Sequence, residues 1–227
     1  MAPSFDGSLV ALARPTSAKR DRLLPVLGPL APLFPGGGLQ RGTVVAVDVA
    51  GGSYHHPELE RSAGGATTLA FALLAAASAT GSWCAGVGTP HPGVLSMADL
   101  GIDLHHLVLV PRPGAAWVEV TATLLDGMDV VLTLLPRSLR PATARRLAAR
   151  ARERQAVLVV LGRRTWWPQG PEVRLEPRDG VWHGLGRGHG YLRARRVEVL
   201  ATGRGVAARP VGVALWLPGP SGGVLPA

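Results

Sequence analysis

The sequence predicts an α/β protein with a mostly parallel central sheet flanked by helices and an antiparallel extension at the C-terminal end. Short runs rich in Val and Leu alternate with helix-like segments between residues 43 and 161. This alternation is typical of strands that are buried on both faces of a parallel sheet. After Gly162, strand-like segments follow one another without helices between them. The 227 residues are 47% hydrophobic, so the chain can form a sizeable core.

The expected elements follow a regular order. Strands are predicted over 42–47, 83–88, 107–110, 129–135 and 156–161, and helices over 67–80, 115–126 and 141–155. Gly81 and Gly127 stop the first two helices. The expected antiparallel extension comprises 173–176, 191–200 and 211–217, and the alternation in Val197-Glu198-Val199 indicates one solvated face.

We expect one domain with two flanking segments. Residues 1–35 mix proline, glycine and charge and are predicted to be an N-terminal arm, with a short helix near 19–27. Residues 36–218 form the expected core domain, and the Pro/Gly-rich residues 219–227 a flexible tail. The longest apolar run, 69–77, is far shorter than the roughly 20 residues of a membrane span. A cytoplasmic protein without membrane contact is therefore expected.

The charge of the chain indicates an anionic partner. Lys and Arg number 24 against 15 Asp and Glu, which gives a net charge of +9. Nucleic acid and an acidic protein both fit this charge. The single cysteine, Cys84, excludes an intramolecular disulfide and lies in an apolar run where burial is expected. The histidines have no cluster of Cys or carboxylate residues beside them, so no metal site is predicted.

The segment 62–77 has the layout of a phosphate-binding P-loop. It reads SAGGATTLAFALLAAA and follows a buried strand, so strand, glycine loop and apolar helix come in that order. A working P-loop ends in Gly-Lys-Ser/Thr, and this one ends in Gly65-Ala66-Thr67. Gly64 and Thr68 complete the pattern, so the glycines and hydroxyls are present and the lysine is missing.

Further motifs stand in a recognisable order around this loop. They are Gly37-Gly38-Leu39 before the first strand, Gly65–Leu69 in the loop, Leu100–Asp103 before the third strand, Asp129–Leu132 in the fourth, and the glycine cluster Gly184–Gly190. In this order, from about residue 36 to 217, the chain resembles the RecA-like superfamily and, within it, the ImuA-type accessory proteins of bacterial mutagenic translesion synthesis. The resemblance implies a RecA-like core.

Departures from the family pattern remove its chemistry. In active members the P-loop lysine reaches the β- and γ-phosphates, and a Walker B aspartate helps to hold Mg²⁺. Alignment with the family places Leu134 at the aspartate, and Gly88-Thr-Pro-His-Pro92 where a catalytic glutamate is expected. With the lysine and both carboxylates missing, we expect no enzyme activity, no catalytic residue and no nucleotide cofactor. Gly64, Gly65, Ala66, Thr67 and Thr68 would then be a vestigial scaffold.

The resemblance implies a non-catalytic accessory protein in DNA-damage-induced (SOS) mutagenesis and DNA repair. Its implied partner is a catalytically inactive Y-family polymerase-like protein, which links it indirectly to an error-prone replicative-type polymerase. Single-stranded DNA is a further candidate ligand, a nucleoid-associated location is expected, and a long homo-filament is not. Two alternatives remain open: a cell-division inhibitor with a degenerate RecA-like fold, and a weak ATPase.

Two arginine-rich segments are candidate DNA contacts. Arg146, Arg150 and Arg154 recur every fourth residue on the helix 141–155 and form one basic stripe. The stripe is either a solvated helix face or a contact with phosphates or an acidic partner.

The second segment is the family's second DNA-binding loop, which the resemblance places after the fifth strand. Its candidate residues are Arg163, Arg164, Trp166 and Trp167 at the beginning and Arg187 and His189 near the end. Mixed guanidinium and indole groups are typical of single-strand binders. The alternative is that the tryptophans pack under a long connection.

Overall fold

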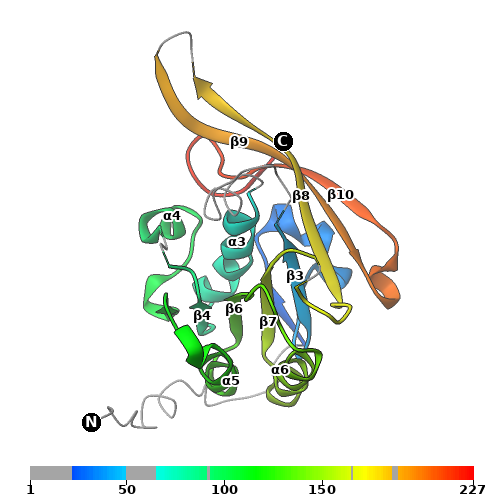
Figure 1. The fold of residues 1–227 in the computed structure, drawn as a ribbon. Helices are drawn as coiled ribbons and strands as arrows, with labels where there is room; N and C mark the ends of the chain where they lie inside the picture. The colour runs from blue at the N-terminus through cyan, green and yellow to red at the C-terminus, as the bar shows by residue number, and fades with distance from the viewer. Residues whose placement is uncertain (1–21, 50–64, 91–92, 165, 186–188) are drawn as a thin grey trace, which may run out of the picture.

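A nine-stranded sheet organises the protein (Figure 1). The computed structural model describes residues 22–49, 65–90, 93–164, 166–185 and 189–227. The strand order is β11-β10-β9-β8-β3-β7-β6-β4-β5. The parallel part comprises β3 (Val44–Asp48), β4 (Cys84–Val87), β5 (Leu107–Val110), β6 (Val130–Leu134), β7 (Val157–Gly162) and the start of β8 (Val173–Leu185). Antiparallel pairing adds β9 (Gly190–Gly203), β10 (Val211–Trp216) and β11 (Leu225–Pro226).

These strands form where continuous apolar runs predict them. The sequence-based expectation of a mixed α/β fold, with a large mostly parallel sheet and antiparallel strands at the C-terminal end, is confirmed. Every residue of β3, β4 and β7 is buried, because helices cover both faces of these strands. Cys84 begins β4 and is buried as expected, and this burial raises the pKa of its thiol to about 12.

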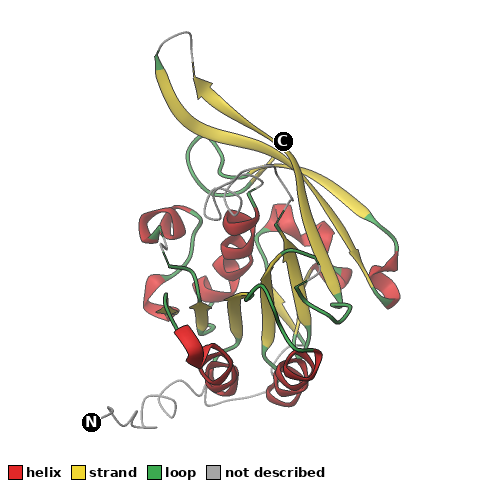
Figure 2. Cartoon of the chain, in the orientation of Figure 1, coloured by secondary structure: helices red, strands yellow, loops and turns green. Residues whose placement is uncertain are grey.

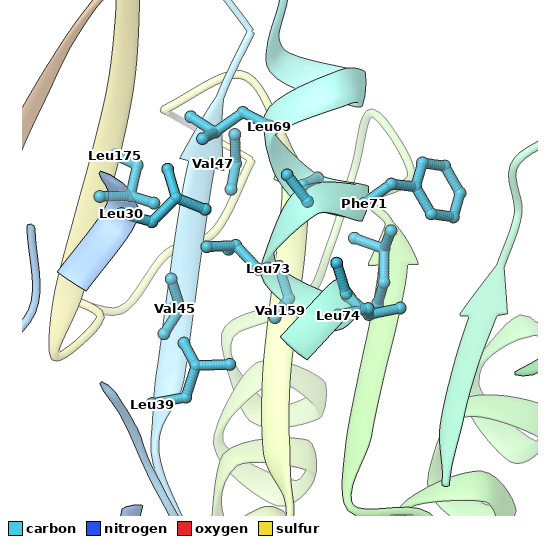
Figure 3. Close-up of a cluster of buried hydrophobic side chains, with 14 of the residues drawn as sticks. Leu30, Leu39, Val45, Val47, Leu69, Phe71, Leu73, Leu74, Val159 and Leu175 are labelled. Carbon is cyan, nitrogen blue, oxygen red and sulfur yellow. The ribbon is translucent and has the colours of Figure 1, made fainter. Parts of the chain in front are cut away.

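The helices lie in two layers. On one face, α3 (Ala66–Ala79) packs against Val45 and Val47 of β3, as Figure 3 shows for its Leu69 and Leu73. On the other face, α5 (Trp117–Gly127) packs on β4 and β6 and α6 (Pro141–Arg154) on β7, in a core that also contains the alternate β3 residues, Val44 and Ala46. Helix α3 is apolar nearly all round because it is also covered on its outer side.

The cover of α3 comes partly from residues that the sequence assigned to an N-terminal arm. The described part of 1–35 begins at residue 22 and contains the 3₁₀ helix η1 (Gly28–Leu33); a second, η2 (Pro35–Gly37), begins at its end. Of the helix expected over 19–27, the described residues 22–27 contain β1 (Leu23–Pro25) instead. Strand β1 pairs with β2 (Gly38–Gln40) in a separate small sheet. Leu30 and Leu39 are buried in the same core as α3, so hydrophobic burial holds this segment on the domain.

Short elements complete the fold. They are α4 (Val94–Asp99), which the sequence did not predict, and the 3₁₀ helices η3 (Leu104–His106), η4 (Gly114–Ala116) and η5 (Gly205–Ala208). The expected tail, 219–227, includes β11, and its Val224 is buried in the α3-side core. Burial of Val224 and the pairing of β11 with β10 therefore hold the tail on the domain, which its Pro/Gly-rich composition did not predict.

Strands β8 and β9 continue beyond the sheet as a two-stranded ribbon (Figure 2). The prediction that the first strand of the extension ends at residue 176 was wrong: β8 runs to Leu185, because cross-strand pairs with β9 continue after two register shifts. The described residues from Arg178 to Arg193 are exposed, including Tyr191. Within the described part of the chain, no helix is long and apolar enough to cross a membrane.

Candidate functional site

The described residues of the predicted vestigial P-loop, Gly65 to Thr68, lie at the start of helix α3, beside the carboxyl edge of the sheet. Strand β3 ends at Asp48 and helix α3 begins at Ala66, with Gly65 before it in a left-handed conformation (φ +83°). Ala66 is fully buried, and Thr67 and Thr68 are half-buried. Gly64 lies outside the described residues. Strand β3 and helix α3 thus stand at the two ends of the predicted loop, and residues 50–64 between them lie outside the described residues.

A guanidinium group of the same chain packs against this helix start. Arg195 of β9 is 2% exposed, and a Cβ added to Gly65 would lie 2.5 Å from its Nη2. Its Nη2 donates to Thr68 Oγ1 over 3.4 Å and its Nε to the Leu217 carbonyl over 3.0 Å. Its Cζ lies 4.9 Å from the ring centroid of Trp182. Burial lowers the pKa of Arg195 to about 10, so it stays charged at neutral pH.

Sequence reasoning missed Arg195, although a signal was present. Val197 and Val199 of β9 are buried in the core on the α3 side, and Arg195 continues their row at two-residue spacing. An arginine in line with the apolar face of an alternating strand either lies beyond the core or is buried with partners. The structure shows the second arrangement.

The two positions that the resemblance aligns with the family's carboxylates lie on neighbouring strands. Leu134 ends β6 and packs against the core on the α3 side. A Cβ added to Gly88, just after β4, would lie 3.5 Å from the Leu134 Cβ. The described residues after β4, Gly88 to Pro90, contain no carboxylate. Leucine and glycine therefore lie together at the two positions that the resemblance assigns to carboxylates, and the rest of that segment, His91 and Pro92, lies outside the described residues.

One carboxylate does lie at this edge, and an arginine binds it. Asp48, the last residue of β3, is 6% exposed and accepts a hydrogen bond from Arg174 Nη1 of β8. Burial raises the pKa of Asp48, and the Arg174 charge opposes this shift. Among the described residues, no group of three His, Cys, Asp or Glu side chains could hold a metal ion.

The basic stripe on α6 is partly neutralised by α5. Arg150 donates from Nε to Asp126 Oδ1 over 2.8 Å and from Nη2 to Oδ2, and Arg154 Nε reaches Asp126 Oδ1 at 3.0 Å. The hydrogen bond from Arg150 lowers the pKa of Asp126. Arg146, the third member, is exposed. Two of the three candidate arginines thus join the helices to each other.

The expected second DNA-binding loop is divided by a strand. Arg163 and Arg164 are exposed after β7, whereas Trp167 is 3% exposed and belongs to the core between the sheet and α6. Trp166 packs against the same core. The indoles therefore lie largely under the connection.

The end of that expected loop lies elsewhere in the fold. His189 is exposed just before β9, at the far end of the ribbon, and Arg187 lies outside the described residues. The assumption of one loop from residue 163 to 190 needs correction: β8 lies between the two groups of candidates because residues 173–185 pair with β9. The connection itself is limited to 163–172.

Comparison with known proteins gives two findings. The model of the MT3502 N-terminal domain family matches residues 32–169, which extend from η1 to the connection before β8. The chain is also 42% identical over 115 residues to the uncharacterized protein Rv3395c of Mycobacterium tuberculosis (strain ATCC 25618 / H37Rv). This match covers 50% of the chain and 55% of that protein, so the chain spans about half the length of the curated relative.

Proposed function

The chain belongs to the MT3502 N-terminal domain family, and we propose that it is a non-catalytic, RecA-like accessory protein of the ImuA type. In this proposal it acts in DNA-damage-induced mutagenesis by binding an inactive Y-family polymerase-like protein. The observation that carries the proposal is the position of Arg195, whose guanidinium group packs on Gly65 at the start of α3. In an active P-loop, phosphate binds at that position.

The strand order supports the RecA-like part of the proposal. In open α/β sheets, ligands bind outside the carboxyl ends of the strands. The carboxyl ends of β3, β6 and β4 lie at one edge, with β7 between β3 and β6. A phosphoryl-transfer site would draw its lysine and carboxylates from these three ends. In this chain Leu134 ends β6, Gly88 follows β4, and Ala66 begins the helix that comes after β3. None of these three side chains can hold a metal ion or polarise water.

The sheet edge supports the partner-binding part. Among the described strands, β5 pairs only with β4, and its four residues are half-buried. An edge strand with open backbone groups can accept a further strand from another chain. At the opposite edge, β11 has two residues and offers little to extend. We place a strand of the polymerase-like partner beside β5, where it would mimic the N-terminal element by which RecA protomers associate.

Hydrogen exchange on the purified complex tests this proposal. The amides of Leu107–Val110 should gain protection when the partner binds, while those of β10 should not change. The interface should bury more than about 1,200 Å² in total. Failure of the two purified proteins to form a complex would overturn the accessory function. A complex without protection at β5 would overturn only the strand addition.

Nucleotide binding provides a separate test. Calorimetric titration with Mg-ATP should give no heat of binding, and light scattering should show no long homo-filaments. Micromolar Mg-ATP affinity would favour the weak ATPase instead.

A further inference from the structure

A cavity lies between helix α6 and the connection from β7 to β8. Its volume is about 540 Å³. Its described lining residues come from three segments: Arg145, Ala148, Ala149 and Arg152 of α6, Gln169 and Gly170 of the connection, and Arg204 after β9. Alanines lie between the two arginines of α6, so the helix leaves space for the guanidinium groups. No residue of the basic stripe Arg146, Arg150 and Arg154 is among this described lining.

The three arginines of the cavity lack acidic partners in the part of the chain that the structure describes. There, none of Arg145, Arg152 and Arg204 forms an ion pair. Glu172 is near the lining residues Gln169 and Gly170 in sequence, but its Oε2 accepts a hydrogen bond from the Val44 backbone N–H over 2.9 Å. Like charges around one space repel each other, so an anion that enters it is stabilised by all three.

Arg204 is also held in position. Its Nε lies 3.5 Å from the Pro171 carbonyl oxygen, and a Cβ added to Gly170 would lie 3.1 Å from the same Nε. The side chain thus lies along the connection, whereas Arg145 and Arg152 come from α6. This position lets guanidinium groups approach a ligand from two directions.

We propose that this cavity binds phosphate groups of a nucleic-acid strand, an inference that does not depend on the proposed partner. A carboxylate is satisfied by one bidentate arginine, whereas a phosphate presents more oxygens and can accept from several. All three arginines are exposed, so the cavity is open to solvent and a chain of phosphates can pass through it. The net charge of +9 favours approach of a polyanion.

Titration of labelled oligothymidine at several salt concentrations tests the proposal. The change is the triple variant R145Q/R152Q/R204Q, and the control is R112Q/R137Q/R196Q, which removes the same charge from exposed arginines outside the cavity and outside the basic stripe. The cavity variant should lose about tenfold or more in affinity, and its log–log salt slope should fall by about 2, or 0.7 for each lost phosphate contact. The control should keep the slope of the parent protein.

Further variants and ligands separate a bound strand from other anions. R145K/R152K/R204K keeps the charge but loses the guanidinium fork, and it should bind with intermediate affinity. Equal losses in the cavity variant and the control, or no oligonucleotide binding by the parent, would overturn the proposal. Binding of pyrophosphate without binding of the oligonucleotide would mean that the ligand of the cavity is a free anion and not a nucleic-acid strand. Equal affinity for polyglutamate would indicate an acidic protein instead. Melting temperatures of all variants check that each is folded.

Discussion

Arg195 and the arginines of the α6 cavity place the same chemical group in opposite environments. Arg195 is 2% exposed and packs between the start of α3 and the ring of Trp182. Arg145, Arg152 and Arg204 are exposed around an open space and have no acidic partner among the described residues. An arginine enclosed by its own chain is a structural element, whereas an arginine facing solvent and other cations is available to a ligand.

The two kinds of arginine also lie on different faces of the sheet. Active P-loops bring phosphate to the first turn of the helix that follows the loop. In this protein that turn carries a buried alanine and contacts a cation of its own chain. The anion-binding capacity that we infer lies instead across the sheet, on the face covered by α6. The proposed vestigial site and the inferred site are therefore different surfaces and can be tested separately.

The largest effect is expected when the missing lysine is restored. Ala66 is fully buried next to Gly65, against which the Arg195 guanidinium packs. Ala66→Lys adds a second cation at the positive end of a helix dipole, which should lower the free energy of unfolding by about 3–5 kcal/mol. Urea denaturation measures this loss. The variant should show no ATPase activity, because Leu134 and Gly88 still supply no carboxylate.

A matched lysine at the other end of the same helix controls this experiment. Ala79 is exposed in the last turn of α3, where a cation is favoured by the dipole. Ala79→Lys should change the stability by less than about 0.5 kcal/mol. Adding Arg195→Met to Ala66→Lys should restore part of the lost stability. If Ala66→Lys were as stable as Ala79→Lys, the two cations would not be close, and Arg195 would not be enclosed at the start of α3.

A smaller effect is expected from filling the contact between Gly65 and Arg195. Gly65 has φ +83° and Gly81 has φ +88°, so alanine is strained at both. At Gly81 an added Cβ meets no described atom within 4 Å, whereas at Gly65 it would lie 2.5 Å from Arg195 Nη2. Gly81→Ala should cost about 1 kcal/mol for the backbone alone, and Gly65→Ala about 1–3 kcal/mol more, because the guanidinium must move.

Thermal denaturation of the two glycine variants separates strain from contact. Arg195→Met should reduce the cost of Gly65→Ala and leave that of Gly81→Ala unchanged. Equal costs for both alanine variants in the parent protein would mean that Arg195 does not close the start of α3.

The parallel sheet could be predicted from the sequence because its strands are continuous apolar runs between helices. The runs at 157–162 and 130–134 carry that pattern without interruption. The ribbon could not be predicted with the same rule, because its strands are exposed on both faces and therefore show no hydrophobic periodicity. Their conformation depends instead on pairing between β8 and β9. Strand β1 was missed for a related reason: three residues are too few to show alternation.

The candidate site could be predicted only in part. The positions of Ala66 and Leu134 at the carboxyl edge of the sheet could be predicted, because each lies at the end of a strand or the start of a helix with a clear local pattern. Arg195 comes from a strand more than a hundred residues later, and its contact with Gly65 depends on how β9 crosses the carboxyl edge. The cavity likewise joins α6 to Arg204, which no helix pattern connects. Sequence periodicity instead singled out the stripe that Asp126 binds.

The smallest effect concerns that stripe and tests the distinction between bound and available arginines on one helix. Asp126→Asn removes the carboxylate that holds Arg150 and Arg154. The pair is partly exposed, so the loss of stability at neutral pH should be below about 1 kcal/mol. The pKa of Asp126 is lowered in the folded protein, mainly by the Arg150 hydrogen bond. The stabilisation is therefore present above the usual carboxyl pKa of about 4 and is lost as the pH falls through the lower folded value. Denaturation of parent and variant at a series of pH values should show a stability difference that disappears in acid.

The same variant frees two guanidinium groups, and it should raise oligothymidine affinity by no more than about twofold if the cavity carries the phosphate contacts. A rise in affinity by the same factor as the loss caused by R145Q/R152Q/R204Q would show that the basic stripe binds the strand. Asp126, by pairing with Arg150 and Arg154, would then control DNA binding by α6.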